Sequence, residues 1–311
     1  MKKILSLVLV LILAFTCLVA CDNGANNGEN NNENNNTEKT YTLALAVDTT
    51  VNAKNKVSNT ALVLVIDADN KIVAARVDSV EATPALDEAG ALVAQDSVKT
   101  KVELGAEYTG MAAGSWADQA KAFEAWLVGK TAADVAGTEF TNELIAGCTM
   151  TSSMATFKAL VAEAFASTTK VTFKTAESFK TGLALSTSVK SGKGGKVTVT
   201  TDVAALAIAG DKVAATAIDS IEQSFTIEEG ALVAGEVKAS KAEQGEDYTG
   251  MPAGAWYKQA AAFSNSTVGK TVAELESLET VSDALAAAGC TMQNTTAGYK
   301  ATIITAAGYA K

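Results

Sequence analysis

The stretch ELGAEYTGMAAGSWADQAKAFEAWLVGKT at residues 103–131 returns later in the chain as EQGEDYTGMPAGAWYKQAAAFSNSTVGKT at residues 243–271. Each copy is followed by a short Gly-Cys-Thr-Met sequence, which holds Thr149 in the first copy and Thr291 in the second. Repeats of about 20 to 50 residues indicate solenoids, but these copies are 140 positions apart, which is long enough for each unit to bury a core. We therefore expect two similar domains in tandem, 41–168 and 177–311, that fold independently and carry any functional site twice.

The first part of each repeat is rich in β-forming residues. The runs are alternating or continuously apolar and are separated by turn residues; they cover 41–47, 61–67 and 71–78 in the first repeat and 182–189, 203–210 and 212–219 in the second. Runs of this kind, joined by tight turns, predict antiparallel strands.

The second part of each repeat has helical periodicity. Three helices are predicted in each repeat. The first starts at a Trp that both copies share, Trp116 or Trp256. The second is short and follows a Thr that has an acidic residue three positions later, and the third begins just after the Gly-Cys-Thr-Met sequence. In the first repeat the caps are Ser115, Thr131 and either Ser152 or Ser153. Strands followed by helices predict an α+β fold, with two tandem repeats that each pack an antiparallel sheet against a few helices.

The N-terminus has the pattern of an export signal. Lys2 and Lys3 precede an apolar run, and Leu-Val-Ala then precedes Cys21. This ending resembles the lipobox of bacterial lipoproteins, in which the Cys becomes the lipidated first residue; an ordinary signal peptide with an incidental Cys is the alternative. We therefore predict a signal peptide over 1–20, lipidation of Cys21, and localisation at the outer face of the cell membrane through that lipid anchor.

Residues 21–40 are predicted to be a disordered tether. The segment from Asp22 to Thr40 contains nine Asn in 19 residues and no large apolar side chain. Such a sequence cannot bury enough apolar surface to offset the entropy lost on ordering. It would hold the first repeat at a distance from the lipid.

Composition excludes several classes of function. The chain has 35 acidic and 25 basic residues, so neither nucleic acid nor anionic lipid is an electrostatic partner. It has no His, which excludes Ser-His-Asp and Cys-His hydrolases, His metal sites and CxxCH haem attachment. Each repeat holds one Cys, Cys148 or Cys290. Two buried thiols are favoured over a bridge between the repeats.

The Gly-Cys-Thr-Met sequences are the first candidate site. Gly147, Cys148 and Thr149 precede a predicted helix, as do Gly289, Cys290 and Thr291 in the second repeat. A Gly that permits close approach of the backbone, a hydroxyl, and the positive end of a helix dipole form a site that accepts a phosphate. A simple helix cap is the alternative.

The sequence IAGCTMTSSMATFKALVAEAF at 145–165 resembles the Ser-Gly-Ala-Thr-x-Thr element of FMN-binding domains in exported redox proteins, and NKIVAARVDSVEATPAL at 70–86 resembles their central strand pair. These proteins include the C subunit of the sodium-pumping quinone reductase and two-domain flavin lipoproteins of extracellular electron transfer. The resemblance implies FMN as cofactor, esterified through its phosphate to Thr149 and Thr291 by a separate flavin transferase.

The chain departs from that family at several positions. Ala146 and Ala288 stand where the family has Ser, and the two Cys stand where it has Ala. The family's acidic residue six places before the Thr is Glu143 in the first repeat but Leu285 in the second, where Asp283 lies two places further back. Thr149 is therefore expected to carry more of the flavin than Thr291.

The second candidate site is the Tyr-Thr-Gly-Met sequence of each repeated block. Tyr108 and Met111, with Tyr248 and Met251 in the second repeat, offer flat or polarizable apolar surface on which an isoalloxazine ring can pack. The alternative is a turn that docks the Trp helix onto the sheet. Nearby Lys101 and Glu103 are interpreted as a solvated strand face.

Two functions fit these observations. The first is a lipid-anchored, extracytoplasmic flavoprotein whose bound FMN passes electrons from a membrane donor to an extracellular acceptor. Such a protein is an electron carrier more than a turnover enzyme, and it is not a hydrolase. Without His or a Cys cluster, haem and iron–sulfur centres are excluded and a bound flavin is the redox group that is left. The second is a surface binding or adhesion lipoprotein that keeps the fold without the flavin.

Overall fold

Long apolar strands form the centre of the structure, a computed structural model that describes residues 37–311 except 109–110, 112–113, 142, 151–152, 168, 249–250, 252–253 and 293–294. The predicted signal peptide, Cys21 and nearly all of the predicted tether lie outside the described residues. The strands are β1 (Lys39–Val51), β2 (Val57–Asp67), β3 (Ile72–Ala82), β4 (Gln95–Val98), β5 (Val171–Thr175), β6 (Phe179–Ser191), β7 (Val197–Ala209), β8 (Lys212–Glu228) and β9 (Ala231–Ala234).

Two antiparallel sheets are formed, with the orders β3-β2-β1-β5 and β4-β6-β7-β8-β9. The three predicted strands of each repeat are confirmed as β1 to β3 and β6 to β8. One short strand crosses between the repeats, because β4 of the first repeat pairs with β6. Another, β5, lies in the segment between the predicted domains and pairs with β1 of the first repeat. The last two residues of the predicted tether, Lys39 and Thr40, belong to β1.

The helices follow the strands within each repeat. They are α1 (Lys101–Leu104), α2 (Trp116–Leu127), α3 (Ala132–Gly137) and α4 (Met154–Ala166), then α5 (Lys241–Gln244), α6 (Trp256–Asn265), α7 (Val272–Glu276), α8 (Asp283–Ala287) and α9 (Thr296–Gly308). Short 3-10 turns extend α1 (η1, Gly105–Glu107) and α5 (η4, Gly245–Asp247), and a third (η3, Lys193–Gly195) connects β6 to β7.

The predicted helix caps are mostly confirmed. Ser115 accepts the backbone N–H of Asp118, and Thr131 and Thr271 form capping boxes with Asp134 and Glu274. Ser153 occupies the N-cap position of α4, but its side chain makes no capping hydrogen bond, and the same holds for Thr295 before α9. The first turns of these two helices therefore lack a side-chain cap.

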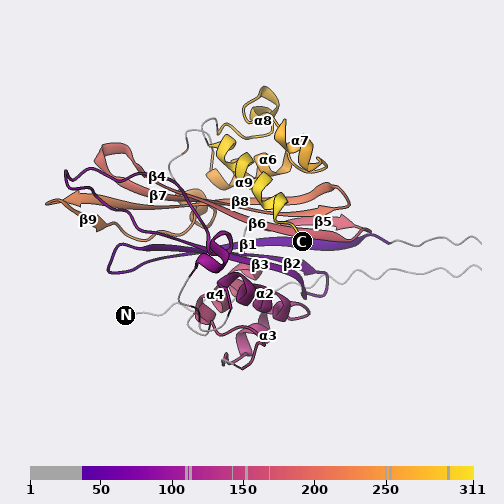
Figure 1. The fold of residues 1–311 in the computed structure, drawn as a ribbon. Helices are drawn as coiled ribbons and strands as arrows, with labels where there is room; N and C mark the ends of the chain where they lie inside the picture. The colour runs from indigo at the N-terminus through magenta and orange to yellow at the C-terminus, as the bar shows by residue number, and fades with distance from the viewer. Residues whose placement is uncertain are drawn as a thin grey trace, which may run out of the picture. The chain divides into compact units, whose positions relative to one another are not determined.

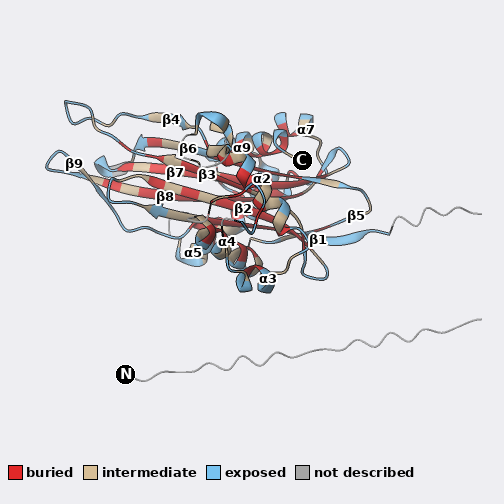
Figure 2. Ribbon diagram, turned by 60° about the horizontal axis from the view of Figure 1, so that its bottom comes forward, coloured by how far each residue is buried: buried red, intermediate tan, exposed pale blue. Residues whose placement is uncertain are grey.

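The layers follow the order helices, sheet, sheet, helices (Figure 1). Each central strand is apolar on both sides because one face meets helices and the other meets the opposite sheet. In β2, Leu62 and Leu64 lie in the core under α2 and α4, whereas Ala61, Val63 and Val65 lie between the sheets. Figure 2 shows the buried positions running along the middle of the strands, while the helices keep exposed outer faces. The α+β fold with antiparallel sheets packed against helices is thus confirmed.

The core between the sheets joins the two repeats. Side chains of β1, β2 and β3 meet side chains of β6, β7 and β8 in one apolar cluster. At its far end the Asn59 amide donates to the Thr201 hydroxyl at 2.7 Å, and Thr201 is also 2.7 Å from Thr187. The described residues form a single compact unit. The limits of the predicted domains stay predictions, as does their independent folding.

Candidate functional site

Thr149 and Thr291 have the same surroundings in the two repeats. The backbone N–H and the hydroxyl of Thr149 both donate to Oε1 of Gln119, at 2.6 and 3.0 Å. Thr291 donates in the same way to Gln259, at 2.9 and 2.8 Å. Both Gln side chains are fully buried in α2 and α6. The loop that carries each Thr is therefore fixed to the helix that starts with the repeated Trp. The sequence analysis did not predict this contact between Thr and Gln.

The Gly before each Cys is required by backbone conformation. Gly147 has a φ of 80° and Gly289 a φ of 97°, values that side-chain-bearing residues rarely adopt. A Cβ at Gly289 would meet no atom within 4 Å, and one at Gly147 only the Ala122 Cβ at 3.9 Å. The positive φ, and not a close approach of the backbone, is thus the reason for glycine at these positions.

Cys148 and Cys290 are buried free thiols. They lie in the helix-covered cores of their repeats together with Met150 and Met292. Burial raises the pKa of both thiols, so neither is prepared to act as a thiolate. The interpretation as two small apolar side chains, with no bridge between the repeats, is confirmed.

Tyr108 and Met111 pack, partly buried, against the same core as Cys148, and Tyr248 and Met251 do so beside Cys290. The structure thus brings the two sequence-predicted stretches of each repeat to one apolar cluster. The Thr-Gly dipeptides between Tyr and Met lie outside the described residues.

The interpretation of Lys101 and Glu103 as a solvated strand face is wrong, because both lie in the short helix α1. Lys101, and Lys241 at the start of α5 in the second repeat, point their ammonium groups into the protein. The Lys241 side chain is only 7% exposed, its Nζ is 2.6 Å from Glu222, and it lies 5.4 Å from the Tyr248 ring centre. Glu243 serves as the third residue of the capping box of α5, as Glu103 does in α1.

The first repeat has the matching arrangement. Lys101 Nζ lies 2.8 Å from Glu81, 4.9 Å from the centre of the Tyr108 ring and 5.8 Å from that of Trp116. Burial raises the pKa of Glu81, but the hydrogen bonds from Lys101 and Lys56 outweigh it, so the net shift is downward and the carboxylate stays ionised. An ion pair that is stacked on aromatic rings is therefore built into each repeat.

One helix turn connects the ion pair to the Thr. Trp116 and Gln119 lie three residues apart on the buried face of α2, one in contact with Lys101 and the other bonded to Thr149. Trp256 and Gln259 repeat this in α6, with Lys241 6.0 Å from the Trp256 ring centre. The candidate site of each repeat is thus a Thr, a buried Gln, a Trp, a Tyr and a Lys–Glu pair.

The repeats differ around this common arrangement. Thr149 is half-buried, whereas Thr291 is exposed. Glu143, at the position where the resembling family has its acidic residue, is exposed; Leu285, at the matching position, is buried in the second core, and Asp283 begins α8.

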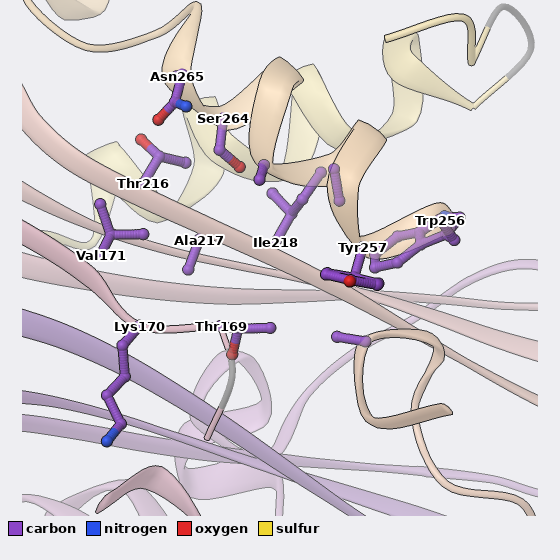
Figure 3. A pocket seen from close by; sticks show the side chains of 13 residues that line it. Thr169, Lys170, Val171, Thr216, Ala217, Ile218, Trp256, Tyr257, Ser264 and Asn265 are labelled. Carbon is purple, nitrogen blue, oxygen red and sulfur yellow. The ribbon is translucent and has the colours of Figure 1, made fainter. Parts of the chain in front are cut away.

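A small cavity lies on the sheet side of α6 (Figure 3). It occupies about 80 Å³ between Trp256 and Tyr257 of α6 and the β8 residues around Ala217, and Thr169 and Lys170, from the segment between the predicted domains, close it on the other side. Binding sites for drug-sized molecules are roughly 300 to 1,000 Å³. This cavity is therefore too small for a flavin ring.

Comparison of the chain with known protein families, with curated proteins and with solved structures found no match. Among the described residues, no helix has the length and apolar character needed to cross a membrane. No cluster of three or more His, Cys, Asp or Glu side chains suited to a metal ion occurs in the same part of the chain.

Proposed function

We propose that the protein is a lipid-anchored flavoprotein outside the cytoplasm that carries FMN for electron transfer, with Thr149 and Thr291 as the attachment points. The observation that carries the proposal is that the same Thr–Gln hydrogen bonds occur in both repeats, at the Thr that corresponds to the attachment Thr of the flavin-binding family. In each repeat a buried Gln accepts the hydroxyl of the Thr and so holds this hydroxyl in one defined position.

The residues of each repeat fit FMN at three points. As a residue, Thr291 is exposed and Thr149 is half-buried. Among the described residues, no side chain caps the helix that follows each Thr, α4 or α9, so its first N–H groups could face an anion. The Tyr and Met of each repeat supply a partly buried apolar wall.

Bound FMN would supply one- and two-electron redox chemistry, and the protein supplies position and electrostatics. The Thr oxygen holds the phosphate, the Gln orients the Thr, and the Lys–Glu pair keeps a positive charge beside the aromatic side chains. A flavin transferase would form the phosphoester: the Thr oxygen would displace a nucleoside monophosphate from a flavin dinucleotide and release its proton, while the Thr backbone N–H would keep its bond to the Gln. The anchor at Cys21 would keep the protein near a membrane electron donor, from which electrons would pass to an extracellular acceptor.

One observation favours a flavin-free binding or adhesion lipoprotein instead. The N–H and hydroxyl of each Thr already have a partner in the buried Gln, so the loop is complete as a structural element. In that case the Thr–Gln pairs would serve only to hold the loops against α2 and α6.

Co-expression with a flavin transferase separates the two functions. A phosphoester survives denaturation, so a fluorescent band on a denaturing gel is expected; Thr149→Ala or Thr291→Ala should dim it, and the double variant should abolish it. Thr149→Ser and Thr291→Ser keep the hydroxyl and serve as controls. A colourless protein, with the transferase and a flavin dinucleotide present, would refute the flavoprotein and leave the binding lipoprotein.

A further inference from the structure

The two repeats differ in the helix layer, at the end of α2 and of its counterpart α6. In the first repeat Trp126 and Phe140 pack together with their ring centres 5.1 Å apart, and both lie against Phe123, at 6.1 and 6.4 Å. The ammonium group of Lys130 lies 4.4 Å from the centre of the Trp126 ring. Two aromatic rings and a cation therefore cover this part of the first core.

In the second repeat the two outer rings are absent from the sequence. The residues 140 positions after Trp126, Phe140, Phe123 and Lys130 are Ser266, Thr280, Phe263 and Lys270. The inner ring and the Lys are thus kept, whereas both outer rings are replaced by small hydroxyl residues.

The hydrogen bonds of the two repeats support this correspondence. Lys158 of α4 donates to the carbonyl of Thr138 at 2.8 Å, and Lys300 of α9 donates to the carbonyl of Leu278 at 3.1 Å. Thr138 and Leu278 are also 140 positions apart and precede Phe140 and Thr280 by two residues. The backbone therefore follows the same course in both repeats up to the position of the missing ring.

A cavity of about 630 Å³ lies between α6, α7 and α8 of the second repeat. Ser266, which replaces Trp126, is part of its wall, as is Lys270. The apolar part of the wall comes from Ala262, Leu278 and Leu285, and the last two pack on or within the second core. Sites for small molecules have volumes of roughly 300 to 1,000 Å³.

We propose that this cavity binds a small, flat aromatic molecule of one or two fused rings, which takes the place that the Trp126 ring has in the first repeat. Ala262, Leu278 and Leu285 supply its apolar contacts, and Lys270 lies beside the ring as Lys130 lies beside Trp126. The site goes beyond the proposed function, because it needs neither the flavin nor Thr291.

The polar part of the wall favours a neutral molecule with an N–H or O–H group, such as an indole or a phenol. The hydroxyls of Ser266 and Ser277 each donate to a backbone carbonyl, at 2.6 and 3.1 Å, so their oxygens can still accept a hydrogen bond from a ligand. The charged side chains of the wall are two Glu and one Lys. This balance disfavours an aromatic carboxylate.

The test uses indole and full-length protein, with the proton NMR signals of indole followed through a titration. Saturable binding with a Kd on the order of 1 mM is expected for a ligand of this size. Ser266→Trp restores the residue of the first repeat, fills the cavity and should weaken indole binding at least tenfold. Thr305→Trp, on the exposed face of α9, is the control and should bind as the parent does. Circular dichroism checks that each variant is folded.

A converse pair of changes moves the site to the other repeat. In the Ser266→Trp background, Trp126→Ser with Phe140→Thr opens the matching place beside Lys130 and should restore indole binding. In the parent, Lys270→Met should weaken binding about two- to fivefold, whereas Lys270→Arg should keep it. No saturable binding by the parent, or equal binding by the parent and Ser266→Trp, would overturn the site.

Discussion

The buried carboxyl group of Asp78 gives the sharpest test of the packing between helix and sheet. Asp78 is 5% exposed, and its Oδ1 accepts the backbone N–H of Ser79 at 2.7 Å and of Val102 at 3.1 Å. Burial raises its pKa from 3.8 to about 7, although the hydrogen bonds from Thr100, Ser79 and Val102 lower it. Asp219 holds α5 in the same way, and burial raises its pKa to about 6.

The direction of the pH dependence follows from these values. Between pH 3.8 and about 7 the native Asp78 holds a proton that the unfolded chain has lost. The free energy of unfolding therefore falls as the pH rises through this window, by at most about 1.4 kcal/mol per pH unit for each such carboxyl. Over the whole window the titration of Asp78 lowers the free energy of unfolding by about 4 kcal/mol. This is a large part of the roughly 5 to 15 kcal/mol that stabilises a domain.

Asp78→Asn removes this titration but keeps an oxygen that can accept both N–H groups. The variant should match the parent within about 1 kcal/mol near pH 4 and exceed it by several kcal/mol near pH 8. Urea unfolding followed by Trp fluorescence from pH 4.5 to 8.5 measures both curves. Asp96→Asn, at an exposed carboxyl, should follow the parent at every pH.

Equal pH dependence in Asp78→Asn and the parent would refute this reasoning. A variant that is less stable than the parent at pH 8 would do so as well. Either result would mean that Asp78 is ionised in the native protein at neutral pH and that its negative charge stabilises the start of α1.

Three further changes have defined outcomes. Cys21→Ser removes the proposed anchor, so the protein should leave the membrane fraction; retention after a carbonate wash would exclude lipidation there. Gly182→Ala puts a Cβ 2.0 Å from the Ala306 carbonyl oxygen and should lower the free energy of unfolding in urea by about 1 to 3 kcal/mol. Gly137→Ala is the control, because its Cβ would meet no atom within 4 Å and should cause no such loss. Equal losses in the two variants would contradict the close approach of Gly182 to Ala306. The sequence predicts that the repeats fold independently, but the inter-sheet core leads us to expect the opposite of a fragment that starts at residue 172. This fragment exposes its half of that core, at about 2 kcal/mol for each large side chain, so calorimetry should show no cooperative transition; a cooperative transition would confirm independent folding. The large side chains concerned are Leu183, Leu185, Val203 and Ile221.

The sequence predicts the central strands and the long helices because their burial patterns are local. The continuous apolar run of β2, for example, identifies a strand that is covered on both faces, and Ser115 marks the start of α2. The pairing of β4 with β6 is not local because it joins the two repeats, and the pairing of β5 with β1 is not local because the whole first repeat lies between these strands in the sequence. Short strands of four or five residues carry little pattern of their own, so neither was predicted.

The same distinction explains the candidate site. Thr149 and its Gly are visible through their position before a helix, but Gln119 contacts Thr149 across 30 residues, and no periodicity marks that contact. The sequence nevertheless indicates that this Gln matters, because Gln119 recurs as Gln259 within the repeated block although the residues around it change. Lys101 recurs as Lys241 in the same way, and a strand-like context concealed that each begins a capped turn.

The segment that follows the last helix of each repeat packs against the other repeat. After α4 the chain passes over the second repeat, where Thr169 and Lys170 border α6. After α9 it passes over the first, where the Lys311 carbonyl accepts the Arg76 guanidinium at 2.9 Å and the Tyr309 hydroxyl donates to Glu103 at 3.2 Å. Each tail therefore lies against the other repeat. The side chains that make these contacts differ between the repeats, whereas the Thr–Gln hydrogen bonds do not, so the two repeats keep the same Thr loop geometry while the surroundings of that loop diverge.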